Sequence, residues 1–271
     1  MLGAIVGDIV GSIYEWHNIK TTDFPLFSTR SHFTDDTVLT LAVAKWLMED
    51  SSHQPEELVR YMQELGRKYP SAGYGGRFRK WLASDTPKPY HSYGNGSGMR
   101  VSPVALYART LDEALELAKI SAQVTHNHRE GIWGAQAIVA CIFMHREGKS
   151  KKEIKDFISG KFGYNLNRRL DDIRPDYRFD ETCLGSVPIA ILAFLEAGSF
   201  EETIRLAISM GGDSDTIACM AGAIAAAGGS EEYAISPEVE NDCMERLTPE
   251  LQKILRDFEA FLQSLQATVP D

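Results

Sequence analysis

Two short acidic segments have the composition of a metal site: Thr34-Asp35-Asp36-Thr37 and Asp213-Ser214-Asp215-Thr216, each at the start of a long apolar run. The unpaired N–H groups of a helix start favour one Asp or Thr as a cap, so capping alone would explain either segment. Two carboxylates per turn exceed that need. If the segments meet in the fold, four carboxylates and two hydroxyls converge, and the like charges raise the pKa values of the carboxyls unless a cation lies between them. Oxygen ligands of this kind suit Mg²⁺ or Mn²⁺.

The first apolar segment carries two further carboxylates. Asp8, Ser12 and Glu15 are spaced by four and three residues, which places them on one face of a helix. Glu15 lies at the end of that helix, next to Trp16 and a loop, from where it can reach over a site. The solvated face of an amphipathic helix is the alternative explanation of this spacing.

A glycine-rich stretch, residues 89–100, could bind an anion. Gly94, Gly96 and Gly98 alternate with small polar residues just before a helix. A backbone free to take positive φ, with its N–H groups turned inward, forms a concave cradle for a pyrophosphate. The shorter cluster at 73–76 could form the opposite wall, and an ordinary flexible turn is the alternative in both cases.

The segment Thr125-His126-Asn127-His128 contains two histidines two residues apart. Such a pair can bind zinc, but no third nitrogen or sulfur ligand has a matching spacing. Capping of the following helix and contact with a ligand remain as two interpretations. The cysteines have no CxxC spacing either, so we expect all four to be reduced and mostly buried: Cys141, Cys183, Cys219 and Cys243.

Helices must position all of these residues, because helical periodicity dominates the chain. No strand series or linker-like stretch interrupts it, so the sequence predicts an all-α fold and a single domain spanning residues 1–271. The predicted helices lie at 3–15, 35–50, 54–69, 74–83, 100–109, 111–124, 130–147, 151–161, 184–196, 200–209, 214–227 and 248–267.

Small residues mark two of these helices as central. Gly3, Gly7 and Gly11 recur every four residues, and the segment 218–227 is rich in alanine. Small residues on one stripe let two helix backbones approach closely. The segment 248–267 has instead the apolar spacing of an outer amphipathic helix.

Composition excludes several classes of protein. The net charge of −10 and pI near 5.2 argue against nonspecific binding to nucleic acid or membrane surfaces, which needs a basic face. The apolar opening segment lacks a basic region and reaches Asp8 too early for a signal peptide or a membrane span. We therefore expect a cytoplasmic protein, and a monomer because no heptad pattern demands association.

Taken together, the motifs give a specific resemblance. The chain resembles the ADP-ribosylglycohydrolase family, the group that includes the dinitrogenase reductase activating glycohydrolases. The matching pieces, in family order over nearly the whole length, are Gly3-Ala4-Ile5-Val6-Gly7-Asp8 leading to Glu15, Phe33-Thr34-Asp35-Asp36-Thr37, Ser92-Tyr93-Gly94-Asn95-Gly96 with Met99-Arg100, Thr125-His126, Val187-Pro188, and Gly211-Gly212-Asp213-Ser214-Asp215-Thr216-Ile217-Ala218.

The resemblance implies a compact orthogonal multi-helix bundle with a binuclear Mg²⁺ or Mn²⁺ centre in a central cleft for ADP-ribose. It implies as metal ligands Thr34, Asp35, Asp36, Asp213, Asp215 and Thr216. The contacts to ribose and pyrophosphate would be Gly73, Gly75, Ser92, Tyr93, Gly94, Asn95, Gly96 and His126. The candidate catalytic residues are Glu15, Asp35 and Asp36.

The resulting hypothesis is a metal-dependent hydrolase. It would cleave the N- or O-glycosidic bond at the distal ribose C1″ of an ADP-ribosylated protein or small conjugate and release ADP-ribose. Two alternatives stay open. One is a non-catalytic ADP-ribose-binding or crystallin-like structural protein, and the other is a two-metal hydrolase of phosphoester bonds.

Overall fold

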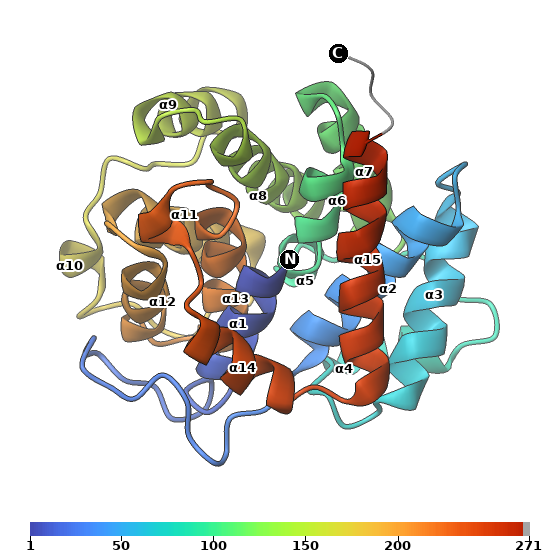
Figure 1. The fold of residues 1–271 in the computed structure, drawn as a ribbon, viewed down its shortest axis with the longest axis horizontal. Helices are drawn as coiled ribbons and strands as arrows, with labels where there is room; N and C mark the ends of the chain where they lie inside the picture. Colours follow the sequence, from blue (N-terminus) through green and yellow to red (C-terminus); the bar gives the residue numbers. More distant parts are fainter. Residues whose placement is uncertain (268–271) are drawn as a thin grey trace.

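Helix α13 (Ser214–Ala225) forms the centre of the computed structural model, and all of its residues are buried. The structure describes residues 1–267, so the last four residues of the predicted domain, 268–271, lie outside the described residues. Around α13 pack α1, α8, α11 and α12, while α2 and α3 lie to one side with α15 against α2 (Figure 1). The other helices are α1 (Leu2–Gly11), α2 (Asp35–Glu49), α3 (Pro55–Lys68), α4 (Gly76–Ala83), α5 (Gly96–Met99), α6 (Ser102–Tyr107), α7 (Leu111–Gln123), α8 (Arg129–Arg146), α9 (Lys151–Phe162), α10 (Leu170–Ile173), α11 (Cys183–Glu196), α12 (Phe200–Ser209), η1 (Glu231–Tyr233), α14 (Pro237–Glu245) and α15 (Pro249–Ala267).

The all-α prediction is confirmed. Within residues 1–267 the structure has no β-strand, only an isolated bridge between Gly94 and Thr182. Each predicted helical segment contains a helix, but the first ends at Gly11 instead of residue 15. The chain turns there because the Ser12 hydroxyl bonds back to the carbonyl of Ile9 and the Tyr14 N–H bonds to Gly11.

The glycine stripe of α1 faces α13 and brings the two backbones into contact, the kind of close approach that a stripe of small residues allows. A Cβ atom built on Gly3 would lie 2.4 Å from the carbonyl oxygen of Gly222. One built on Gly7 would lie 2.1 Å from that of Ala218, and one on Gly11 would lie 2.4 Å from the Cα of Asp215. Any side chain on this stripe would therefore push α1 away from α13.

We expect Gly7→Ala to lower the free energy of unfolding by about 1–3 kcal/mol, measured by urea denaturation, because overpacking outweighs the gain in helix propensity. Gly160→Ala is the matched control. Gly160 is exposed in α9 with no atom within 4 Å of the built Cβ. The control should gain up to about 1 kcal/mol. Equal effects at the two positions would contradict the close backbone contact.

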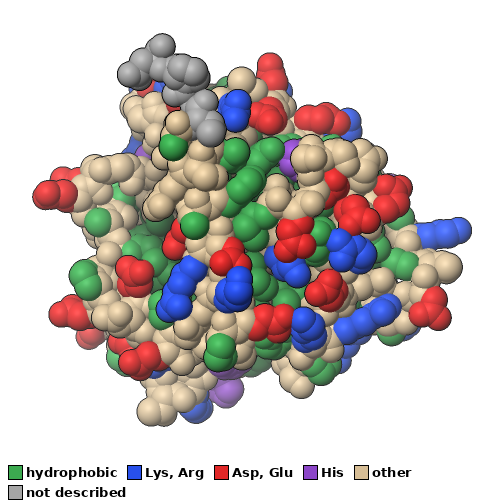
Figure 2. Space-filling model, turned by 45° about the vertical axis from the view of Figure 1, so that its right-hand side comes forward, with side chains coloured by type: hydrophobic (Ala, Val, Ile, Leu, Met, Phe, Trp, Pro, Cys, Tyr) green, Lys and Arg blue, Asp and Glu red, His purple; other side chains and the backbone are tan. Residues whose placement is uncertain are grey.

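Figure 2 shows acidic and basic side chains interspersed on one face of the protein, with no separate basic surface on that face. Helix α15 buries Leu251, Ile254, Leu255 and Phe258 and exposes its other side, as its periodicity predicted. Among the described residues, no helix is both long and apolar enough to cross a membrane.

Candidate metal centre and substrate loop

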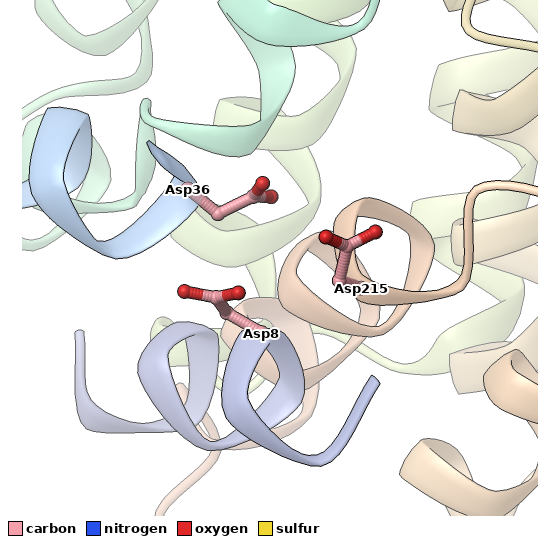
Figure 3. A group of neighbouring side chains, drawn as sticks. All are labelled: Asp8, Asp36 and Asp215. Carbon is pink, nitrogen blue, oxygen red and sulfur yellow. The ribbon is translucent and has the colours of Figure 1, made fainter. Parts of the chain in front are cut away.

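Three helix segments bring their carboxylates together. Oxygens of Asp8, Asp36 and Asp215, from α1, α2 and α13, lie within 4.8 Å of one another (Figure 3). A second group with the same spacing consists of Glu15, Asp213 and Asp215. Asp36 and Asp215 lie in the first group, so the two acidic segments predicted from the sequence meet in the fold. Asp215 belongs to both groups and is the carboxylate that they share.

Asp8 joins α1 to the start of α2. Its carboxylate accepts hydrogen bonds from the backbone N–H of Thr34 at 2.9 Å and of Thr37 at 3.1 Å, and from both threonine hydroxyls. It is fully buried. These four donors hold a charge that burial alone would disfavour. They also place the first turn of α2 against the end of α1.

Capping explains only one of the two acidic helix starts. Thr34 is the N-cap of α2, and its hydroxyl oxygen accepts from the Asp36 N–H at 3.3 Å. Asp213 occupies the N-cap position of α13 but makes no capping bond. Its carboxylate accepts instead from the Asn95 amide at 2.7 Å. The Asp213 carboxylate therefore caps no backbone N–H of α13 and is hydrogen-bonded to the glycine-rich loop.

Glu15 is held near Asp213 by a side chain from the following loop. The Asn18 amide donates to the Glu15 carbonyl at 2.8 Å and to the Gly212 carbonyl at 2.9 Å, and its oxygen accepts from the Gly212 N–H at 2.8 Å. Gly211 and Gly212 have φ of 69° and 75°, which only glycine adopts readily. This turn and Asn18 together place Glu15 beside the start of α13.

Burial raises the pKa of the carboxyls in the centre, and neighbouring carboxylates raise it further for Glu15, Asp35, Asp36 and Asp215. Burial, followed by the charge of Asp213, raises the pKa of Glu15 to about 7. Burial, followed by the charge of Asp8, raises the pKa of Asp35 to about 8. The pKa values of Asp36 and Asp215 are raised well above the usual range, again by burial first and neighbouring carboxylates second. Protons or a divalent cation must offset this charge.

The residues fit a hard divalent cation. Two buried carboxylate oxygens, Oδ1 of Asp36 and Oδ1 of Asp215, have no hydrogen-bond partner in the described part of the protein. Such atoms are expensive to bury unless something binds them. The hydroxyls of Thr34 and Thr216 each lie 3.2 Å from Oδ2 of Asp36, which adds neutral oxygens to the set. An all-oxygen donor set matches Mg²⁺ or Mn²⁺.

Asp35 lies at the edge of the two groups and is only half-buried. Its Oδ1 is 3.3 Å from a Cβ built on Gly73, whose φ of 102° requires glycine. Its N–H bonds to the Ala72 carbonyl at 2.6 Å. The structure therefore places Gly73 beside the centre. A Cβ built on Gly75 would have no atom within 4 Å, so this position faces open space.

The predicted glycine-rich loop lies against residues 181–183. The Asn95 N–H donates to the Glu181 carbonyl at 2.8 Å, and the Cys183 N–H donates to the Tyr93 carbonyl at 2.9 Å. The Ser92 hydroxyl accepts from the Gly94 N–H at 3.1 Å. The Tyr93 side chain is exposed. Through Asn95 and Asp213 the loop is joined directly to the carboxylates.

The predicted reason for the glycines in this loop is wrong. None of Gly94, Gly96 and Gly98 has a positive φ. Close packing explains them better, because a Cβ on Gly96 would lie 3.2 Å from Nε2 of His126 and one on Gly98 would lie 3.0 Å from Sδ of Met220. The missing side chains make room for the imidazole of His126 instead of turning the backbone.

The two histidines of the 125–128 segment have different surroundings. The ring of His128 accepts from the Glu130 N–H at 3.1 Å and so caps α8. His126 is buried beside the glycine-rich loop. Burial, together with the charges of Arg100 and Arg77, holds the pKa of His126 well below 6.5, so its imidazole is neutral at pH 7.

The cysteines are buried and free, as predicted. Burial raises the pKa of the Cys183 thiol to about 12, which removes it as a nucleophile.

Sequence reasoning missed two residues of this site. Asp8 was noticed for its spacing but not assigned to the metal ligands, although it completes the group with Asp36 and Asp215. Its position on the glycine face of α1 was the available signal. Asn18 has no signal in the sequence, because its partner Gly212 is brought to it only by the fold.

Several known proteins are similar to this chain in sequence or in fold. A family model described as ADP-ribosylglycohydrolase matches residues 1–265. ADP-ribosylhydrolase ARH3 of Gallus gallus is 27% identical over 321 residues, covering 90% of this chain and 87% of the relative. ADP-ribosylarginine hydrolase Tri1 of Pseudomonas putida strain GB-1 is 23% identical, covering 84% of this chain and 68% of the relative. A solved chain described as an ADP-ribosylglycohydrolase-related protein complex has a TM-score of 0.66 at 23% identity, covering 90% of this chain and 95% of that one, and so shares the fold.

Proposed function

Since the chain belongs to the ADP-ribosylglycohydrolase family, we propose that it is a metal-dependent glycosidase that cleaves the bond at the distal ribose C1″ of an ADP-ribosylated substrate. The product is ADP-ribose, and the reaction reverses ADP-ribosylation. The observation that carries the proposal is the presence of two clusters of three carboxylates, which have Asp215 in common. Two such groups offer places for two cations side by side.

The proposed ligands of the two divalent cations are the carboxylates of the centre and its two threonine hydroxyls: Asp8, Thr34, Asp35, Asp36, Asp213, Asp215 and Thr216. Mg²⁺ or Mn²⁺ bound there would supply Lewis-acid binding of the ribose hydroxyls and neutralise the charge of the carboxylates. Asp8 differs from the rest, because its four hydrogen bonds also hold the start of α2 against α1. The unpaired oxygens of Asp36 and Asp215 support this set.

Glu15 and Asp35 are the proposed proton-transfer groups. Glycoside hydrolysis needs a carboxyl to protonate the leaving group and a carboxylate to take a proton from the attacking water. Glu15 and Asp35 are less buried than Asp36 and Asp215, so a water molecule or a leaving group can reach their carboxyls more easily. Asp36, fully buried, is better suited to binding than to proton transfer.

The glycine-rich loop is the proposed binding surface for the ribose and pyrophosphate. Asn95 links it to Asp213, and His126 lies against Gly94 and Gly96. The proposed contacts are Gly73, Ser92, Tyr93, Gly94, Asn95, Gly96 and His126. The predicted contact of Gly75 and the predicted central cleft remain proposals, as do the monomeric state, the single domain and the cytoplasmic location.

Neither alternative function is favoured by an observation of this structure. A non-catalytic ADP-ribose-binding or crystallin-like protein needs no cluster of buried carboxylates with raised pKa values, which is costly to keep. A phosphoester hydrolase would use the same cations but release phosphate. The linkage that is cleaved also remains open, because the relatives include both an ADP-ribosylhydrolase and an ADP-ribosylarginine hydrolase by name.

We expect release of free ADP-ribose, without phosphate, from at least one member of a panel of substrates linked through Arg, through Ser and through O-acetyl-ADP-ribose. The assay should be run with Mg²⁺, with Mn²⁺ and with a chelator, because activity should disappear when the cations are removed. Release of phosphate in place of ADP-ribose would favour the phosphoester hydrolase. Binding of ADP-ribose without turnover of any substrate would favour the non-catalytic alternative.

A further inference from the structure

Arg100 is a buried guanidinium that forms no ion pair in the described part of the chain. It is 0% exposed, and its Nη2 donates to the Ser121 carbonyl at 2.7 Å and to the Thr125 hydroxyl oxygen at 2.9 Å. Its Nε and Nη1 have no hydrogen-bond partner among these residues. Burying such a cation is costly. Since Arg100 has no surface that a substrate could touch, any role in the site must act through a neighbour.

The hydrogen bond from Arg100 fixes the direction of the next one. A guanidinium can only donate, so the Thr125 oxygen accepts from it. The same oxygen lies 2.7 Å from Nδ1 of His126. If Nδ1 were the donor, the hydroxyl hydrogen of Thr125 would have no acceptor in a side chain that is 0% exposed. An unsatisfied buried donor is disfavoured, so Thr125 donates to Nδ1.

This direction determines which nitrogen of His126 carries the proton. A neutral imidazole that accepts at Nδ1 must be protonated at Nε2. Nε2 lies 3.2 Å from a Cβ built on Gly96 and 3.6 Å from one built on Gly94, on the proposed substrate loop. Among the described residues it has no hydrogen-bond partner of its own. The chain therefore presents an uncharged, unused N–H to this loop.

We propose that Arg100 and Thr125 are positioning residues that hold His126 in the Nε2–H tautomer, so that Nε2 donates a hydrogen bond to a phosphate oxygen of the ADP-ribosyl group. This inference rests on the proposed function for the identity of the ligand. A phosphate oxygen only accepts hydrogen bonds, so the opposite tautomer would direct a lone pair at it. The relay provides a donor of defined direction whose own ring carries no charge.

The tautomer can be measured without any ligand or activity. The measurement is a two-dimensional ¹H–¹⁵N spectrum of the imidazoles, in which the signals of His126 are assigned by their loss in His126→Gln. In the wild type, Nδ1 of His126 should be unprotonated and hydrogen-bonded, and Nε2 should be protonated. Thr125→Val should move the Nδ1 resonance, because it removes the hydroxyl at nearly constant volume. Thr125→Ser should restore the wild-type spectrum. A protonated Nδ1 in the wild type would overturn the proposal.

Calorimetric titration with ADP-ribose tests the consequence for binding. Thr125→Val should weaken the affinity about tenfold, and Thr125→Ser should recover most of that loss. Thr125 is a better test than Arg100, whose replacement would alter a large buried volume. Unchanged affinity in Thr125→Val would overturn the proposed role of the relay. If the wild type binds no ADP-ribose, the proposed function fails instead, and the spectra still show whether the tautomer is held.

Discussion

Replacing Asp215 by Asn should reduce the release of ADP-ribose by on the order of a thousandfold or more. Asp215 is the carboxylate shared by the two groups, so its loss weakens both proposed cation positions at once. Asn keeps the shape of the side chain but removes the charge, and the buried start of α13 can keep its packing. The measurement is the initial rate of ADP-ribose release with saturating Mg²⁺ or Mn²⁺, together with a circular dichroism spectrum that should match the wild type.

Asp156→Asn is the matched control for this variant. Asp156 is an exposed carboxylate of α9 that pairs with Lys152 at 2.6 Å, far from the centre in the chain. Its replacement changes the net charge of the protein by the same amount and should leave the rate within about twofold, as expected of an exposed ion pair. If Asp215→Asn kept more than about a tenth of the wild-type rate, the two-cation proposal would be wrong.

Without divalent cations, the protein should lose stability as the pH rises from about 5 to about 8. The pKa values of Glu15 and Asp35 are raised from 4.5 and 3.8 to about 7 and about 8. Within those intervals the folded protein binds more protons than the unfolded chain, so the free energy of unfolding falls with increasing pH. For each such carboxyl the slope is at most on the order of 1 kcal/mol per pH unit, smaller where solvent screens the group, and it is confined to the interval between the ordinary and the raised pKa.

Mg²⁺ or Mn²⁺ should reverse this loss at pH 8, because a cation that binds only the folded state stabilises it by mass action. At a hundred times the dissociation constant the gain is about 3 kcal/mol. The measurement is urea denaturation in a chelator and in each cation, at several pH values. Asp215→Asn should be less sensitive to pH and should respond little to either cation. A wild-type stability that rises with pH in the chelator would contradict the proposed electrostatics.

The sequence was sufficient for most of the longer helices and for the two acidic segments, because both leave local signals. The small residues of α13 and the glycine stripe of α1 predicted that these helices are central, and the structure places them in contact. Helix α14 was not predicted, since its sequence is mostly polar and it buries only Cys243. Short helices such as α5 and α10 carry too few residues for a periodic pattern to be recognised.

The site was less predictable where its geometry depends on distant contacts. The first helix ends before Glu15, so this residue reaches Asp213 through the turn held by Asn18 and not from a helix face. The glycines at 94, 96 and 98 were interpreted as a backbone requirement, whereas the packing of His126 and Met220 explains two of them. A composition pattern cannot distinguish the two reasons, because glycine serves both.

The contact between the backbones of α1 and α13 also bears on which ions the proposed centre would accept. Asp8 and Asp215 extend from two helices whose main chains touch at Gly7 and Gly11, so the distance between the Cα atoms of these two residues is set by the backbone. We expect this spacing to favour the smaller of two hard cations. Ca²⁺ prefers six to eight oxygens at about 2.3–2.6 Å, whereas Mg²⁺ takes six at about 2.0–2.1 Å. The three glycines of α1, by setting this spacing, would then contribute to the choice of cation.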